Sequence, residues 1–154
     1  MPPSAKPHTA SVQSAAFPGQ FDSLSAILEF VTQAAKRAGL DAQAIYAVQL
    51  AVDEACSNII EHAYGGEGQG EIQCVCVVNR RGLTVTLRDQ GAPFDPSSVP
   101  DPDLYSPLEE RREGGLGLYL MRRLMDELHF EFIPGTGNVL TMVKRRRAPA
   151  KPKR

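Results

Sequence analysis

The spacing of apolar residues alternates along this chain between a helical period and a strand period. Residues 24–38 carry apolar side chains every three or four positions, which predicts an amphipathic helix capped by Asp22 or Ser23 and ended by Gly39. The same spacing predicts a second helix that begins at a cap on Asp41. Its buried stripe is expected to consist of Ile45, Val48, Val52, Ala55, Cys56, Ile59 and Ala63.

Alternating side chains predict strands elsewhere in the chain. Residues 72–78 and 83–87 flank an Arg-Arg-Gly turn, which indicates an antiparallel hairpin. Residues 130–132 and 139–143 flank a Pro-Gly-Thr-Gly turn in the same way. A short edge strand is expected at 12–17, before a Pro-Gly turn.

Between the two hairpins, the pattern predicts a lid followed by a third helix. Residues 93–114 contain five prolines and almost no periodic apolar pattern, which is typical of a mobile functional loop. The third helix should begin at the glycines 114–115 and run through Leu128, with Arg122, Arg123, Asp126 and Glu127 on its polar side. This order of elements favours an α+β fold, a two-layer sandwich with helices on one face of a mostly antiparallel sheet.

Length and composition indicate one domain. The chain has 154 residues, and its 42% hydrophobic content suffices for a core. We expect this domain at 12–144, with a flexible lead-in at 1–11 and a basic disordered tail at 145–154. No apolar run approaches the ~20 residues of a membrane span, and the start of the chain is polar and proline-rich, so no membrane association and a cytoplasmic location are expected. The cysteines form neither a disulfide nor a zinc pattern and are expected as buried thiols: Cys56, Cys74 and Cys76.

The net charge of −1 conceals an asymmetry. Residues 144–154 hold 7 of the 17 basic residues and no acidic residue, leaving 10 basic and 18 acidic residues in 1–143. Such a run can contact nucleic acid or an acidic partner. Its prolines and its terminal position favour a disordered solubilising tail instead, and direct binding of nucleic acid is not expected.

Glu54 and Asn58 form the first candidate site pair. They lie four residues apart, so their side chains should share one face of the second helix, roughly opposite the stripe of Val48, Val52, Ala55 and Ile59. An amide oxygen suits magnesium, and a nearby carboxylate can accept a proton from an attacking hydroxyl. By itself, the pair also fits an ordinary solvated helix face.

Two glycine-containing segments complete the candidate chemistry. Asp89 should lie where a strand ends, where its carboxylate can accept a hydrogen bond from an exocyclic amine while Gly91 lets a base approach the main chain. An ordinary turn explains that segment equally well. The run 114–117, Gly-Gly-Leu-Gly, opens the third helix, and its backbone amides favour phosphate. It matches neither a Walker A loop nor the Rossmann fingerprint.

Together, the segments 50–64, 89–91 and 114–118 make the chain resemble the anti-sigma factor serine/threonine-protein kinases of the histidine kinase-like (GHKL) ATPase superfamily. The resemblance covers about residues 12–144 and implies the GHKL ATPase fold with ATP and Mg²⁺ as cofactors. It implies that Glu54 is the general base and Asn58 the magnesium ligand. Nucleotide binding would further involve Asp89, Gly91, Gly115, Leu116, Gly117 and Leu118.

The resemblance also implies partners. In that family, the γ-phosphoryl group passes to a serine or threonine of a STAS-domain anti-sigma factor antagonist, and the kinase sequesters a sigma factor, commonly as a homodimer. Alternatives remain: a non-catalytic ATP-binding partner switch, a detached histidine-kinase ATPase, or a nucleic-acid-binding protein acting through its tail.

The chain departs from the family pattern at two places. Residues 92–94, Ala-Pro-Phe, replace a segment that often contains a glycine, which should stiffen the entrance to the lid. Residues 137–139 read Gly-Asn-Val instead of Gly-Thr-Thr, and Thr141 is the nearest threonine, so the usual hydroxyl contact to the base is in question.

Overall fold

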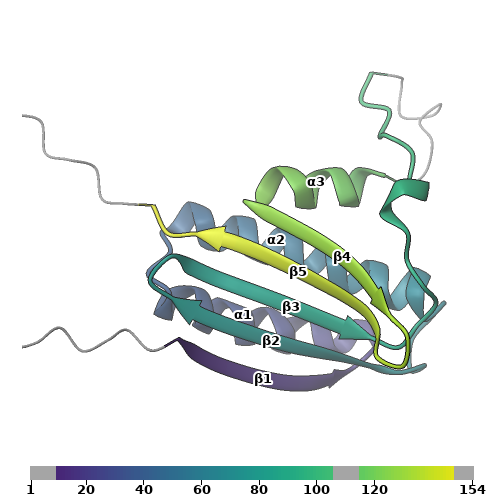
Figure 1. Cartoon of the computed structure of the whole chain (residues 1–154), viewed down its shortest axis with the longest axis horizontal. Coiled ribbons are helices and arrows are strands. Elements are labelled where there is room, and N and C mark those ends of the chain that lie inside the picture. Colours follow the sequence, from purple (N-terminus) through teal and green to yellow (C-terminus); the bar gives the residue numbers. More distant parts are fainter. Residues whose placement is uncertain (1–9, 106–114, 148–154) are drawn as a thin grey trace, which may run out of the picture.

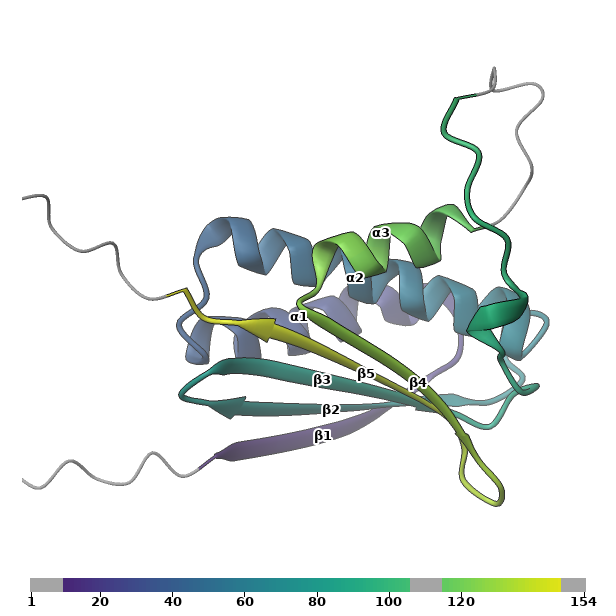
Figure 2. The same ribbon diagram turned by 45° about the horizontal axis from the view of Figure 1, so that its top comes forward.

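The described residues, 10–105 and 115–147 of the computed structural model, form a five-stranded antiparallel sheet with helices on one face (Figures 1 and 2). The sheet order is β1-β2-β3-β5-β4, and every neighbouring pair is antiparallel. The strands are β1 (Ser11–Pro18), β2 (Glu71–Asn79), β3 (Gly82–Asp89), β4 (Glu127–Ile133) and β5 (Gly137–Arg145). Both predicted hairpins and the N-terminal edge strand are confirmed.

Three α-helices of the described residues lie on the same side of the sheet, which confirms the α+β two-layer architecture (Figure 2). Asp41 caps the second helix as expected, because its Oδ1 accepts a hydrogen bond from the Ala44 amide at 2.8 Å. The helical elements are η1 (Phe21–Ser23), α1 (Leu24–Arg37), α2 (Ala42–Asn58), a π-helical turn η2 (Ile59–Ala63), a 3₁₀ turn η3 (Pro96–Ser98) and α3 (Leu116–Leu124).

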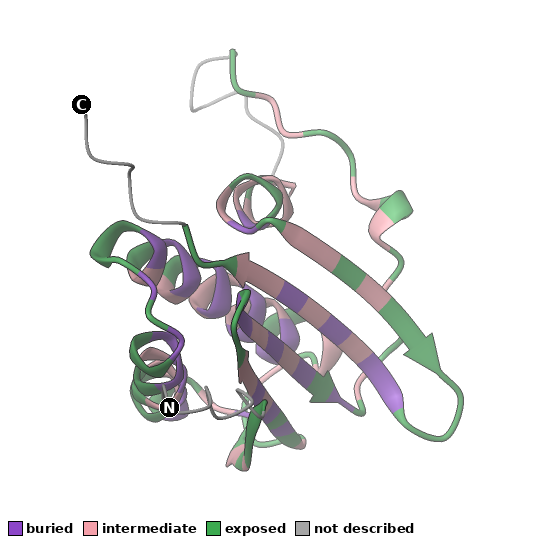
Figure 3. Cartoon of the chain, turned by 60° about the vertical axis from the view of Figure 1, so that its left-hand side comes forward, coloured by how far each residue is buried: buried purple, intermediate pink, exposed green. Residues whose placement is uncertain are grey.

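The core lies between the sheet and the helices. Buried and more exposed residues alternate along the central strands, so only one face of the sheet is fully covered (Figure 3). Leu83, Val85 and Leu87 of β3 are completely buried, as are Val48 and Val52 of α2. The three cysteines are free and buried in this core, as the sequence predicted.

The predicted cap of the first helix is wrong. Neither Asp22 nor Ser23 makes a capping bond, because the chain enters α1 through η1 and Ser23 already has helical backbone angles. A residue in that conformation cannot direct its side chain back to the free amides of the first turn. The Phe21 amide instead donates to Oε1 of Glu67 at 2.8 Å.

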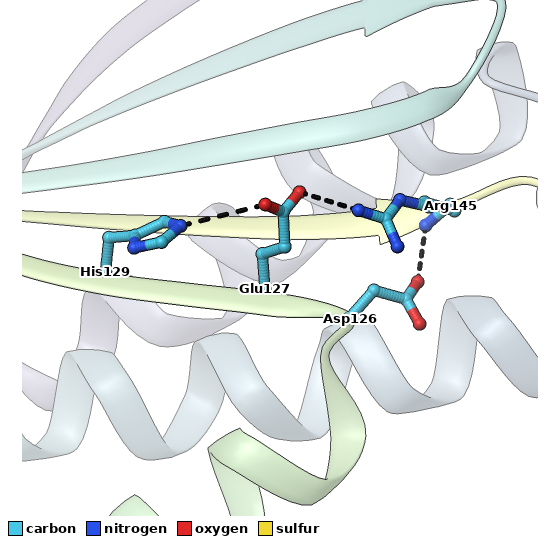
Figure 4. Close-up of polar contacts among 4 residues, drawn as sticks. All are labelled: Asp126, Glu127, His129 and Arg145. Atoms are coloured by element: carbon cyan, nitrogen blue, oxygen red, sulfur yellow. Dashed lines mark hydrogen bonds and ion pairs between the residues drawn. The ribbon is translucent and has the colours of Figure 1, made fainter.

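The third helix is shorter than the sequence pattern predicted. It ends at Leu124, and Met125 is extended, so Leu128 lies in β4 opposite Met142 instead of in a helix. Two of the four residues expected on its polar side contact β5 instead. Asp126 Oδ2 accepts from the Arg145 amide at 2.6 Å, and Glu127 pairs with the Arg145 guanidinium at 3.1 Å (Figure 4). Strand pairing therefore overrides the helical spacing of Leu124 and Leu128. Arg145, which begins the segment expected as a tail, is part of β5.

The expected lid is described only in part. Residues 93–105 follow β3, include η3 and rise away from the sheet beside the start of α3 (Figure 2). The ring of Phe94 packs against Phe130 of β4 with centroids 4.9 Å apart, which ties the first part of this segment to the sheet. Residues 106–114 of the expected lid lie outside the described residues, as do 1–9 and 148–154. Among the helices of the described ranges, none is long and apolar enough to cross a membrane.

Candidate functional site

A cavity of about 450 Å³ lies between α2, α3 and the ends of β3 and β5. Its volume is within the range of roughly 300–1,000 Å³ that small-molecule sites occupy. Residues 92–94 and 98–100 form a further part of its wall. The cavity therefore brings together segments that lie far apart in the sequence, from Glu54 to Leu140.

Glu54 and Asn58 lie on the wall that α2 contributes. Within the part of the chain that the structure describes, neither side chain makes a hydrogen bond or an ion pair, so both present free polar groups to the cavity. The expectation that they lie opposite the buried stripe is wrong. Ala55 and Ile59 of that stripe line the same cavity, because residues one position apart on a helix are only about 100° apart around its axis.

Asp89 also lines the cavity, at the last position of β3, and is only 4% exposed. Its Oδ1 accepts two hydrogen bonds, one from the Gly91 amide and one from Nδ2 of Asn138, each 2.9 Å long. Among the described residues, no group bonds its Oδ2. Burial raises the pKa of this carboxyl above its ordinary value, while the hydrogen bonds from Asn138 and Gly91 oppose the rise. The site thus holds an oriented carboxylate with one oxygen available.

Gly91 does not line the cavity, and its contribution is a close approach of two backbones. A Cβ at this position would overlap the carbonyl of Ala63. That carbonyl accepts a hydrogen bond from the Ala92 amide at 2.8 Å. Tyr64 acts nearby, since its hydroxyl accepts from the Gln90 amide at 3.0 Å. The end of η2 therefore fixes the segment that follows Asp89.

Of the two glycines at the start of α3, Gly117 faces the α2 wall, and Gly115 lies against the backbone of Pro100. Gly115 has a φ of 82°, a left-handed conformation that favours glycine, and it precedes the first helical residue. A Cβ at Gly117 would lie 2.7 Å from Oε2 of Glu54, so a larger residue here would displace the end of the Glu54 side chain. Leu118 lines the cavity, whereas Leu116 is 48% exposed and does not.

Asn138 is a site residue that the sequence analysis did not identify. It is 8% exposed, lies opposite Asp89 in the β3–β5 register and contacts the cavity. Thr141 cannot replace the missing hydroxyl, because Leu140 and Met142 of β5 face the helices and Thr141 therefore faces the other side of the sheet. The only signal in the sequence was the departure at 137–139 itself.

The donor set fits a magnesium ion that is held together with a nucleotide. No cluster of three or more His, Cys, Asp or Glu side chains that could hold a metal ion occurs in residues 10–105 and 115–147. Mg²⁺ needs no such cluster, because it commonly takes one or two protein oxygens and completes its shell with phosphates and water. The amide of Asn58 has no bonding partner among the described residues, and its Nδ2 lies 3.5 Å from the position that a Cβ on Gly117 would take, so this side chain can supply a ligand of that type next to the start of α3.

Comparison with known proteins agrees with this geometry. The model of the histidine kinase-like ATPase domain matches residues 17–144. The chain is 38% identical to a protein named serine-protein kinase RsbW from Bacillus velezensis, over 70% of this chain and 69% of the relative. It is 35% identical to RsbW of Listeria monocytogenes, over 70% of this chain and 71% of the relative. It is 36% identical to RsbW of Bacillus cereus, over 70% and 69%. The match over 17–144, on a fold that brings α2, the end of β3 and the start of α3 around one cavity, shows that the chain belongs to the histidine kinase-like ATPase domain family.

Proposed function

We propose that this protein is an ATP-dependent serine/threonine protein kinase that acts as an anti-sigma factor. One observation carries the proposal: Glu54 and Asn58, which have no bonding partner among the described residues, line a cavity that Asp89 and the N-terminus of α3 also line. The relatives named serine-protein kinase support the same activity.

The cavity suggests how the nucleotide lies. Adenine would sit at Asp89, whose Oδ2 can accept a hydrogen bond from the exocyclic amine. The phosphates would lie at the start of α3, where the free amides and the helix dipole favour negative charge. Bound Mg²⁺ would neutralise charge on the phosphates, and the Asn58 amide oxygen would hold it.

Glu54 would remove the proton from the attacking hydroxyl. In the transfer, the oxygen of a serine or threonine forms a bond to the γ-phosphorus, and the bond between that phosphorus and the β–γ bridging oxygen breaks. The Glu54 carboxylate takes the hydroxyl proton, and ADP leaves with the electron pair of the broken bond. Because Glu54 and the backbone at Gly117 are close, the proposed base and the proposed phosphate-binding turn would face the same reacting group.

The proposed partners follow from the relatives and not from the cavity. The phosphate acceptor would be a STAS-domain anti-sigma factor antagonist, and the sequestered protein would be a sigma factor. Such a partner would place the protein in the cytoplasm, where transcription occurs. A homodimer is part of the same proposal.

The test is phosphate transfer from labelled MgATP to a panel of STAS-domain proteins from the same genome. We expect wild type to label one of them and Glu54→Gln to bind MgATP but not to transfer. Glu61→Gln is the matched control, because this carboxylate is on the same helical segment but does not line the cavity and is 55% exposed. If wild type binds ATP and labels no panel member, the kinase proposal fails and a non-catalytic ATP-binding partner switch replaces it.

A further inference from the structure

One buried amide joins three groups at the Asp89 end of the cavity. Nδ2 of Asn138 donates both to Oδ1 of Asp89 and to the carbonyl of Ala92, each at 2.9 Å. Its Oδ1 accepts from the amide of Phe94 at 2.9 Å. Only this orientation of the side chain satisfies all three partners, since a flipped amide would place an oxygen against two acceptors and a donor against a donor.

The position of Asn138 follows from the close approach of β3 and β5. Asp89 and Asn138 are paired in the register of the two strands. The preceding residue, Gly137, has a φ of 107°, and a Cβ there would overlap the Asp89 carbonyl. The backbone therefore holds Asn138 next to the carboxylate, although 49 positions separate the two residues in the sequence.

The two sets of bonds act on different parts of the site. The bond to Oδ1 of Asp89, together with the one from Gly91, fixes the carboxylate and leaves Oδ2 for a ligand. The bonds to Ala92 and Phe94 fix the main chain at the start of the segment that forms the cavity wall at 92–94. Phe94 is held a second time by its ring contact with Phe130.

We propose that Asn138 is a positioning residue that couples base selection at Asp89 to the conformation of residues 92–94. This inference rests on the proposed nucleotide function of the cavity but not on phosphoryl transfer. A change in the carboxylate's orientation and a change at the start of the segment would then occur together, because one side chain holds both.

The test compares ATP with inosine triphosphate, which lacks the exocyclic amine, by calorimetry on Asn138→Ala. We expect its affinity for ATP to fall at least about tenfold, the effect of losing one well-placed hydrogen bond. Its affinity for inosine triphosphate should change much less, so the preference for ATP is lost. By NMR, the Phe94 amide should exchange with solvent faster than in wild type.

Two further variants make the test decisive. Asn138→Ser keeps a small polar side chain, but its single hydroxyl donor cannot serve both Asp89 and Ala92. It should therefore reduce the ATP preference less than Asn138→Ala does, and it replaces Asn138→Ala if that variant does not fold. Asn79→Ala is the control, because Oδ1 of Asn79 bonds the Arg81 and Gly82 amides in the turn at the other end of β3, and it should change neither reading.

Several outcomes would overturn the inference. One is an equal loss of affinity for both nucleotides, and another is an unchanged preference with Phe94 exchange as in wild type. If wild type does not prefer ATP to inosine triphosphate, both this inference and the assignment of Asp89 to adenine are wrong. Wild type that binds ATP selectively but transfers no phosphate would refute only the kinase activity.

Discussion

Replacing Asp89 with asparagine tests the assignment of the adenine end most directly. The substitution preserves shape, and the new Oδ1 can still accept from Gly91 and Asn138. The second oxygen, however, becomes an NH₂ group. A donor would then face the exocyclic amine of adenine, which is itself a donor. The variant therefore loses one charge-assisted bond without losing its internal contacts.

The expected loss can be worked from that single bond. A hydrogen bond to a charged group contributes about 1.5–3 kcal/mol, so the Kd for ATP should rise about 10- to 150-fold. Inosine triphosphate should lose no affinity and can bind more tightly, because its C6 carbonyl can accept a hydrogen bond from the new NH₂ group. Calorimetry on wild type and Asp89→Asn, each with ATP and with inosine triphosphate, gives the four Kd values that this comparison needs. An ATP affinity within about twofold of wild type would refute the assignment, because no hydrogen bond of that strength would then have been lost.

The same variant has a pH signature in stability. Burial raises the native pKa of Asp89 above its ordinary value of 3.8. Between pH 3.8 and the native pKa, the native state therefore binds more protons than the unfolded state. Its contribution to stability is therefore fully present below pH 3.8 and decreases as pH rises through the native pKa. Relative to Asp89→Asn, the wild type should lose free energy of unfolding over this window, as denaturant titrations at several pH values can measure. A constant difference would contradict the raised pKa.

Three further substitutions and one labelling experiment test separate parts of the structure. Asn58→Ala should weaken binding of MgATP but not of ATP in the presence of a chelator; equal losses in both would reject Asn58 as a metal ligand. Gly117→Ala should reduce phosphate transfer more than MgATP binding, with an unchanged circular dichroism spectrum, because its Cβ would displace the Glu54 carboxylate; unchanged transfer would contradict this contact. Burial raises the pKa of Cys56 to about 12, so a thiol reagent at pH 8 should label it only after unfolding. Leu83→Ala, fully buried in β3, should cost about 2–5 kcal/mol of stability in denaturant titrations, and a loss below about 1 kcal/mol would contradict its place in the core.

The sequence alone determined the features that depend on short-range geometry. The four-residue spacing of Glu54 and Asn58 places both side chains on the same wall of the cavity, because a helix turns every 3.6 residues. Alternation located β2 and β3 and placed Asp89 at a strand end. The cap at Asp41 could be read in the same way, since it acts within one helical turn.

Tertiary structure decided what local patterns leave open. Leu128 satisfies both a helical and a strand spacing, and only its pairing with Met142 makes it part of β4. Asn138 joins the site because the register of β3 and β5 brings it to Asp89, a contact that no local spacing encodes. Gly117 meets Glu54 for a similar reason, since the packing of α3 against α2 sets their distance. Local chain geometry thus supplied the chemical groups, and long-range packing selected which of them meet.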